Sequence, residues 1–208
     1  MRIISGSFKG KKLFSLKGSA TRPTADRVRE SIFNILASNI ANASVLDLFA
    51  GTGALGLEAL SRGAANAVFI DSSASAVQII QKNILACKTE NRVQVIRWDI
   101  AKNINCLPPD TLAFDLVFMD PPYNKNYILP ALKKLMKQNI LKDGSTIIIE
   151  HSGAEPVPQN HPGIQLADQR IYGKTLVSFL TVVLQENLCQ THWNQTDTGT
   201  DKPRWPCK

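Results

Sequence analysis

Two short motifs in this chain combine residue types that could carry out chemistry together. The first extends from Asp47 to Gly56 with the sequence DLFAGTGALG, and the second, DPPY, extends from Asp120 to Tyr123. Glycines spaced as GxGxxG let the backbone turn tightly and approach a bound ligand. A carboxylate, two prolines and an aromatic ring can hold a planar amine near that ligand. The two motifs predict an enzyme that binds a small activated donor and presents an amino group to it.

The ligand of the first motif is indicated by the acid that precedes it. The glycines alone match the fingerprint of dinucleotide-binding loops, and they also suit a glycine-rich turn that binds nothing. Asp47, however, is expected on the strand just before the loop. A carboxylate there suits an anionic pyrophosphate poorly, whereas it suits the ammonium and sulfonium groups of S-adenosylmethionine. The charge favours a methyl donor over NAD.

Two further acids are expected at the ends of the next strands. Asp71 lies about 20 residues after the glycine loop, where a carboxylate can accept the hydroxyls of an adenosine ribose. Asp99 could accept a hydrogen bond from an adenine amino group, although a single Asp at such a place is often only a loop residue or helix cap. The predicted cofactor contacts are Asp47, Phe49, Ala50, Gly51, Gly53, Asp71, Ser72, Asp99 and Ile100.

The second motif suits activation of an exocyclic amine on a nucleobase. Such a nitrogen is a poor nucleophile because its lone pair is delocalised into the ring. If the Asp120 carboxylate and the Pro121 carbonyl accept its N–H groups, the nitrogen can pyramidalise, which is electrostatic preorganisation for the transition state. Pro122 stiffens the loop, and the ring of Tyr123 offers a surface on which an unstacked base can lie. A rigid turn with a chance Asp and Tyr is the alternative.

The hydrophobic pattern predicts the scaffold that positions these motifs. Buried-type strands alternate with amphipathic helices, which predicts an α/β fold with a parallel sheet covered on both faces. The last two strands follow each other without a helix and are expected to form a hairpin at one edge. Strands are predicted at 45–49, 67–71, 93–98, 114–120, 146–150, 165–171 and 177–184, and helices at 24–36, 54–62, 74–87 and 128–138.

Three segments are expected along the chain. Residues 1–43 form a basic extension with a strand or hairpin and a helix, residues 44–184 form the catalytic domain, and residues 185–208 form a polar, flexible tail. The four cysteines are far apart and form no Cys-x-x-Cys pair, so neither a metal site nor a disulfide framework is predicted. Without a run of about 18 apolar residues or a signal sequence, a cytoplasmic protein with no membrane partner is expected.

The charge of the chain points to a polyanionic partner. The formal net charge is +7 for 208 residues, and a basic surface binds nucleic acid through counterion release. The first thirty residues are rich in Lys and Arg, although a solvated amphipathic helix would explain much of this pattern equally well. The predicted RNA contacts are Lys9, Lys11, Lys12, Arg22, Arg27 and Arg29.

The chain resembles the RsmD family of bacterial methyltransferases over residues 1 to about 184. The resemblance lies in the opening RIISG and KGKKL, the segment from Arg22-Pro23-Thr24 to Phe33-Asn34, both motifs above, and Tyr172-Gly173 before the last strand. It differs in having Lys9 and Lys11 where the family commonly has arginine, which should weaken bidentate phosphate contacts.

This resemblance implies a class I S-adenosylmethionine-dependent methyltransferase, with a Rossmann-like, mostly parallel sheet of seven strands and an antiparallel terminal strand. It also implies that the acceptor is the exocyclic N2 of a guanine in 16S ribosomal RNA, of the guanine 966 type. The RNA would be part of the 30S subunit or an assembly intermediate, and the enzyme a monomer.

Three other functions remain compatible with the residues alone. A DNA adenine-N6 methyltransferase shares every core residue, because DPPY also serves adenine N6 and cytosine N4, and a close variant serves a glutamine amide. An NAD-linked oxidoreductase could use the glycine fingerprint. A non-catalytic ribosome-assembly factor could keep the fold for RNA binding, although it would not need the intact DPPY motif.

Overall fold

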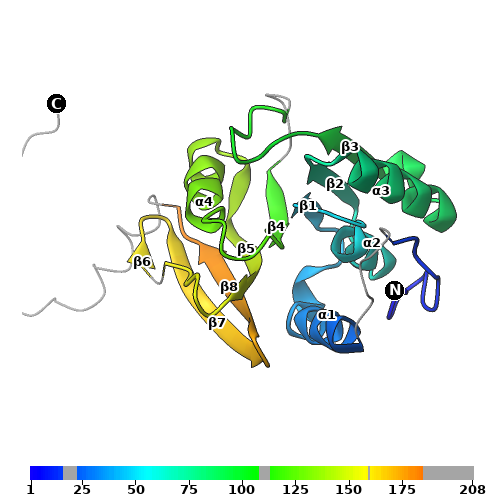
Figure 1. The fold of residues 1–208 in the computed structure, drawn as a ribbon, viewed down its shortest axis with the longest axis horizontal. Helices are drawn as coiled ribbons and strands as arrows, with labels where there is room; N and C mark the ends of the chain where they lie inside the picture. Colours follow the sequence, from blue (N-terminus) through cyan, green and yellow to red (C-terminus); the bar gives the residue numbers. More distant parts are fainter. Residues whose placement is uncertain (16–22, 108–112, 159, 185–208) are drawn as a thin grey trace, which may run out of the picture.

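An eight-stranded sheet runs through the structure, which is a computed structural model (Figure 1). The structure describes residues 1–15, 23–107, 113–158 and 160–184. The tail predicted at 185–208 and the predicted RNA contact Arg22 therefore lie outside the described residues.

The sheet confirms the predicted α/β fold. Strands β1 to β5 are parallel, β8 lies antiparallel between β5 and β7, and the two-residue β6 adds to the outer edge of seven longer strands. The order across the sheet is β3-β2-β1-β4-β5-β8-β7-β6. The strands are β1 (Ser44–Leu48), β2 (Asn66–Asp71), β3 (Val93–Arg97), β4 (Phe114–Met119), β5 (Leu141–Ser152), β6 (Asn160–His161), β7 (Ile164–Tyr172) and β8 (Thr175–Val182).

Helices cover both faces of this sheet, as Figure 1 shows. Helices α1 (Pro23–Ile35), α2 (Ala54–Ser61) and α3 (Ala74–Cys87) pack on one face, and α4 (Ile128–Lys137) packs on the other. Side chains alternate along a strand, so neighbouring residues join different cores. Val45 of β1 belongs to the core under α1 to α3, and Leu46 to the core under α4. Two short 3-10 helices, 37–39 and 90–92, complete the helical elements of the described chain.

Strand β5 is longer than the prediction of 146–150. Its first residues after Leu141 are polar and exposed, so they carry no apolar pattern, and its register with β4 shifts between Phe114 and Leu116. Its last residues extend the strand because they pair with the start of β8, where Ser152 lies opposite Thr175. Both extensions depend on distant partners rather than on the local sequence.

An N-terminal hairpin, which comprises residues 1–13, packs against α2. Its two arms are joined by a bridge between Arg2 and Lys12. The carboxylate of Glu58 on α2 is fully buried and accepts hydrogen bonds from the backbone N–H groups of Ile4 (2.8 Å) and Ser5 (3.0 Å). It also forms an ion pair of 2.8 Å with Arg62. One buried acid therefore attaches the hairpin to the sheet-covering helix.

Two kinds of feature are absent from the described residues. None of the helices there is long and apolar enough to cross a membrane. The same residues contain no group of three or more His, Cys, Asp or Glu side chains that could hold a metal ion.

Candidate active site

A cavity of about 270 Å³ lies where β1, β4 and β5 end. It brings the two motifs together, because residues of the glycine loop and Asp120 line the same space. The sheet register explains this, since Met119 of β4 lies opposite both Leu48 of β1 and Ile149 of β5. The lining residues are Met1, Arg29, Ile32, Asp47, Phe49, Ala50, Gly51, Thr52, Ala54, Leu55, Asp120 and Glu150.

The glycine loop connects β1 to α2 through backbone in the left-handed region. Phe49, Gly51 and Gly53 have φ values of 59°, 57° and 73°, and Gly53 is the residue that caps the start of α2. Glycine adopts this conformation without strain, whereas Phe49 is an exception whose ring stacks on Tyr127 at 5.9 Å. Gly51 therefore brings the loop to the cavity without a side chain, whereas Phe49 contributes to the cavity lining.

Asp47 forms the buried base of this loop. The residue is 2% exposed, and one carboxylate oxygen accepts a hydrogen bond of 2.9 Å from the N–H of Gly56. Burial raises the pKa of the Asp47 carboxyl to about 8; the Gly56 hydrogen bond opposes that increase, and the charge of Asp71 adds to it. A carboxyl with this pKa favours a cation beside it, because a positive charge would stabilise its ionised form.

Gly56 allows α2 to approach β2 closely. A Cβ atom at this position would lie 2.4 Å from Cε1 of Phe69 and 3.2 Å from a carboxylate oxygen of Asp47. Any larger residue would push the helix away from the sheet and disturb the Asp47 hydrogen bond. The third glycine of the motif therefore serves packing, and the first two serve the turn.

The other predicted cofactor contacts, Asp71, Ser72, Asp99 and Ile100, do not line this cavity. Asp71 accepts hydrogen bonds of 2.8 Å from the N–H groups of both Gly51 and Ser73. Asp99 follows β3 and accepts a bond of 3.1 Å from the N–H of Ala101. Ser72 is exposed, and Ile100 is buried. The ribose and adenine contacts assigned to this edge stay predictions.

Asp120 stands at the open side of the cavity, directly after β4. It is exposed to solvent through the cavity mouth, and it accepts no hydrogen bond from the described residues. The surrounding protein, followed by the charges of Glu150 and Asp47, raises the pKa of its carboxyl well above the usual range.

Tyr123, the last residue of the DPPY motif, contacts two further side chains. Its hydroxyl donates a hydrogen bond of 2.8 Å to Glu150 and lies 3.2 Å from the hydroxyl of Thr175, while 39% of the residue is exposed. Pro121 is buried and Pro122 is exposed. Burial raises the pKa of both the Tyr123 hydroxyl and the Glu150 carboxyl.

Glu150 is a site residue that the sequence analysis did not include. It lies two residues before the end of β5, level with Asp120, and it lines the cavity. Its position as the last residue of the strand predicted at 146–150 could have identified it. The same kind of position, at or near the end of a predicted strand, pointed to Asp47, Asp71 and Asp99. It was missed because it belongs to no short motif.

Arg29 differs from its prediction as an RNA contact. Its side chain is only 5% exposed and lines the cavity wall. The guanidinium donates hydrogen bonds to the backbone oxygen of Arg2 (2.5 Å) and to Asp26 (3.2 Å). The N-terminal hairpin covers it, so it is unavailable to a polyanion on the outer surface.

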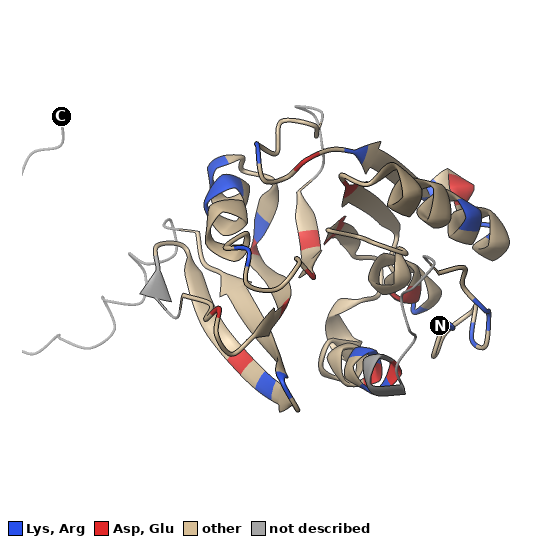
Figure 2. Ribbon diagram, in the orientation of Figure 1, with Lys and Arg blue, Asp and Glu red and all other residues tan. Residues whose placement is uncertain are grey.

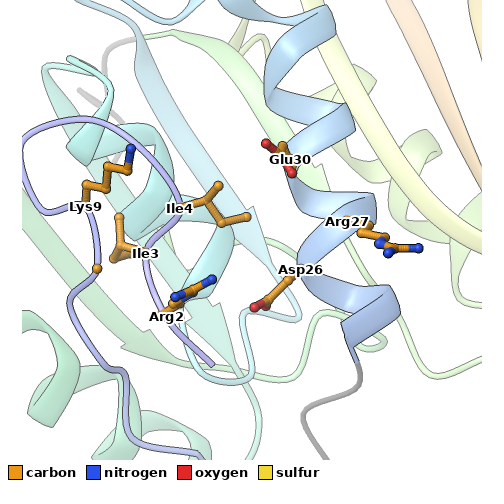
Figure 3. Close-up of a pocket in the computed structure, with 8 residues that line it drawn as sticks. Arg2, Ile3, Ile4, Lys9, Asp26, Arg27 and Glu30 are labelled. Carbon is orange, nitrogen blue, oxygen red and sulfur yellow. The ribbon is translucent and has the colours of Figure 1, made fainter.

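Two of the remaining predicted RNA contacts, Lys9 and Arg27, line a second cavity of about 360 Å³ between the N-terminal hairpin and α1. Figure 2 shows Lys and Arg on this hairpin, and Figure 3 shows how side chains from both elements frame the cavity. Arg27 is exposed on α1, as are Lys9, Lys11 and Lys12 on the hairpin, but the acids Asp26 and Glu30 interrupt this basic surface. Their contact with RNA stays a prediction.

Comparison with known proteins shows the family of this chain. The family described as "Conserved hypothetical protein 95" matches residues 1–181. "Ribosomal RNA small subunit methyltransferase D" of Escherichia coli is 37% identical over 163 residues, which cover 77% of this chain and 80% of that protein. The chain belongs to the RsmD family. Its relative of the same name in Haemophilus influenzae is 37% identical over 167 residues, covering 77% of this chain and 84% of that protein.

A solved structure extends this family relationship to the fold. The structure, described as a "putative methyltransferase" from Escherichia coli, has a TM-score of 0.79 at 33% identity and covers 89% of this chain and 99% of that chain. The predicted class I methyltransferase fold, with seven long strands and an antiparallel terminal strand, is therefore confirmed.

Proposed function

We propose that this protein is an S-adenosylmethionine-dependent methyltransferase that modifies the exocyclic N2 of a guanine in small-subunit ribosomal RNA. The observation that carries the proposal is the single cavity lined by Asp47, the glycine loop and Asp120. The names of the family relatives support ribosomal RNA as the acceptor.

The cavity has the charges that the methyl donor requires. When bound, S-adenosylmethionine supplies a methyl group on a positively charged sulfur, which becomes a neutral thioether after transfer. Asp47, Asp120 and Glu150 surround this space with carboxyl groups that favour the ammonium and sulfonium. Arg29 adds a buried positive charge on the wall, which suits the carboxylate of the methionine portion. Asp71, beside Gly51, is placed to accept ribose hydroxyls.

Asp120 serves the acceptor side of the reaction. Its carboxylate accepts an N2–H of guanine while the ring lies on Tyr123, and the N2 lone pair turns towards the methyl carbon. The new N–C bond forms as the C–S bond breaks, with that electron pair going to sulfur. The N2 proton passes to Asp120 and then to water. Holding the two reacting atoms in line lowers the barrier by up to about 7–11 kcal/mol in well-aligned systems.

The substrate that we propose is ribosomal RNA within the 30S subunit or its assembly intermediate, bound by a monomeric enzyme. The exposed lysines of the N-terminal hairpin, together with Arg27 on α1, support an RNA surface near α1. The guanine numbered 966 is the specific target that the family resemblance suggests.

A transfer assay tests this proposal. Isolated small subunits, naked ribosomal RNA and duplex DNA are each incubated with radiolabelled S-adenosylmethionine, and the products are digested to nucleosides for mass spectrometry. We expect N2-methylguanosine from the RNA substrates. N6-methyladenine in the DNA would instead establish a DNA methyltransferase. A separate thermal-shift measurement tests the oxidoreductase, because a melting temperature raised by NAD but not by S-adenosylhomocysteine would favour that function.

A further inference from the structure

Glu150 provides a second hydrogen-bond acceptor immediately beside the one that the DPPY motif supplies. The pairing of Met119 with Ile149 places the residues that follow them level with each other, with Asp120 directly after β4 and Glu150 two residues before the end of β5. Both carboxyl groups line the same cavity. Any base whose amine reaches Asp120 therefore presents its neighbouring ring atom to the region of Glu150.

The orientation of Glu150 leaves one oxygen available for a ligand. Its Oε1 accepts the hydrogen bond of 2.8 Å from the Tyr123 hydroxyl, and Oε2 accepts none from the described residues. Tyr123 is itself held by Thr175, so the carboxylate is restrained on one side and free on the other. A half-buried acceptor of this kind favours a ligand that brings its own N–H group.

The amino-bearing bases differ at the ring nitrogen next to the amine. In guanine the N2 amine is flanked by N1–H, which is a donor, on the Watson–Crick edge and by N3, an acceptor, on the other side. In adenine the N6 amine is flanked by N1, and in cytosine the N4 amine is flanked by N3, and both of these nitrogens are acceptors. Two adjacent carboxylates therefore match the edge of guanine, whereas they would place a carboxylate against a ring lone pair in adenine or cytosine.

We propose that Glu150 accepts the N1–H of the target base and so selects guanine over the other amino-bearing bases. This inference rests on the proposed guanine-N2 activity and adds the residue that determines base choice. Asp120 accepts a hydrogen bond from the reacting N2 amine, and Glu150 accepts one from the adjacent N1–H. Tyr123 contacts the base and donates a hydrogen bond to the Glu150 carboxylate. A site built to bond a substrate N–H can reject an analogue that lacks it by about 10⁴-fold.

The test uses a base that keeps the reacting 2-amine, leaves the neighbouring N1 unprotonated and carries a 6-amine in place of O6. Small-subunit RNA is prepared by splinted ligation with 2,6-diaminopurine at the guanine that the enzyme methylates, because this base has the 2-amine but an unprotonated N1. We expect wild-type enzyme to methylate guanine at least about 100-fold faster, as kcat/KM. Comparable rates on the two bases would overturn the inference without any variant.

The variant Glu150→Gln then tests whether this side chain causes the preference for guanine over 2,6-diaminopurine. Its amide oxygen can still accept from Tyr123, while its amide NH₂ can donate to N1 of diaminopurine. We expect the rate on guanine to fall and the rate on diaminopurine to rise, so that the preference shrinks to a few-fold. Unchanged melting temperature and S-adenosylhomocysteine affinity would show that the fold and the donor site are intact.

A matched variant separates base choice from support of Tyr123. Thr175→Val removes the other partner of the Tyr123 hydroxyl, so it should lower the rates on both bases by a similar factor and leave the preference intact. If Glu150→Gln behaves in the same way, Glu150 only positions Tyr123 and the inference is wrong, although the guanine-N2 activity stands. If wild-type enzyme places no methyl group on guanine N2, the proposed function itself fails.

Discussion

The two sides of the active-site cavity are built differently. On the side of the glycine loop, each carboxylate is held by backbone, with Asp47 bonded to Gly56 and Asp71 bonded to Gly51. On the side of DPPY, the carboxylate of Asp120 has no hydrogen-bond donor among the described residues. Under the proposed function, the site is therefore prebuilt for the methyl donor and incomplete for the acceptor base.

This difference shows how the protein separates two recognition tasks. Backbone hydrogen bonds fix the donor side before anything binds, so little ordering is needed when the cofactor enters. On the proposed acceptor side, Asp120 accepts no hydrogen bond from the described residues and Glu150 accepts only the one from Tyr123. An amine that bonds to Asp120 is then held where the proposed reaction needs it, whereas a group without N–H leaves these acceptors unsatisfied.

The largest expected effect follows from removing the acceptor-side carboxylate. Asp120→Ala should lower kcat by at least about 10²–10³-fold, because the charge that stabilises the developing cation on nitrogen is lost. Affinity for S-adenosylmethionine should stay within a few-fold, since backbone-held groups bind the donor. Single-turnover transfer and calorimetric titration measure the two quantities. Loss of donor binding would show that the two sides are not separate.

Gly56→Ala tests how rigidly the donor side is built. The new Cβ would lie 2.4 Å from Phe69, so we expect a loss of about 1–3 kcal/mol in the free energy of unfolding. In a domain of this size each kcal/mol lowers Tm by about 2–4 °C. Gly153→Ala is the control, because its Cβ would meet nothing closer than 3.7 Å. Equal melting temperatures for the two variants would contradict this account of the packing.

The pH dependence of donor binding tests the charge of Asp47. Because its pKa is raised to about 8, the empty protein holds this proton at neutral pH, and a bound cation favours its release. Affinity for S-adenosylmethionine should therefore increase with pH by up to about tenfold per unit, and level off above pH 8. S-adenosylhomocysteine, which lacks the sulfonium, should show a weaker dependence. The Asp47→Asn variant should bind S-adenosylmethionine more weakly and lose the pH dependence of its affinity. Calorimetric titrations in buffers of different ionisation enthalpy would give the number of protons released on binding.

The smallest effects are expected on the outer surface. Lys9→Ala or Lys11→Ala should weaken RNA binding a few-fold and lower the slope of log affinity against log salt concentration by about 1. Lys137→Ala, on the exposed surface of α4, is the matched control. Filter binding at several salt concentrations gives the slopes, and equal slopes for all three variants would place the RNA elsewhere.

Local patterns were sufficient to predict most of the scaffold and one side of the site. The alternation of apolar runs predicted α3 with its observed bounds, 74–87, and predicted β1, β2 and β4 to within one residue at each end. The glycine loop and DPPY were identifiable because each lies within a few residues of one turn, where the local sequence controls the backbone. Their convergence on one cavity follows from the order of the parallel strands.

Features that depend on distant contacts were not predictable in this way. Glu150 gains its place from the pairing of β5 with β4 and β8, which joins residues far apart along the chain. Arg29 has a charged side chain of the kind that usually lies on the surface, but the N-terminal hairpin covers it. In both cases the chemistry of the side chain was visible, and only the fold decided which surface it faces.

The attachment of the N-terminal hairpin has a consequence for the order of folding. Glu58 and Ile4 are 54 positions apart, and closing so long a loop carries an entropic penalty that local helix formation does not. We therefore expect α2 to form first and the first residues of the chain to dock late. Because Met1 contributes to the cavity wall, donor-binding competence should emerge only with this slow final event.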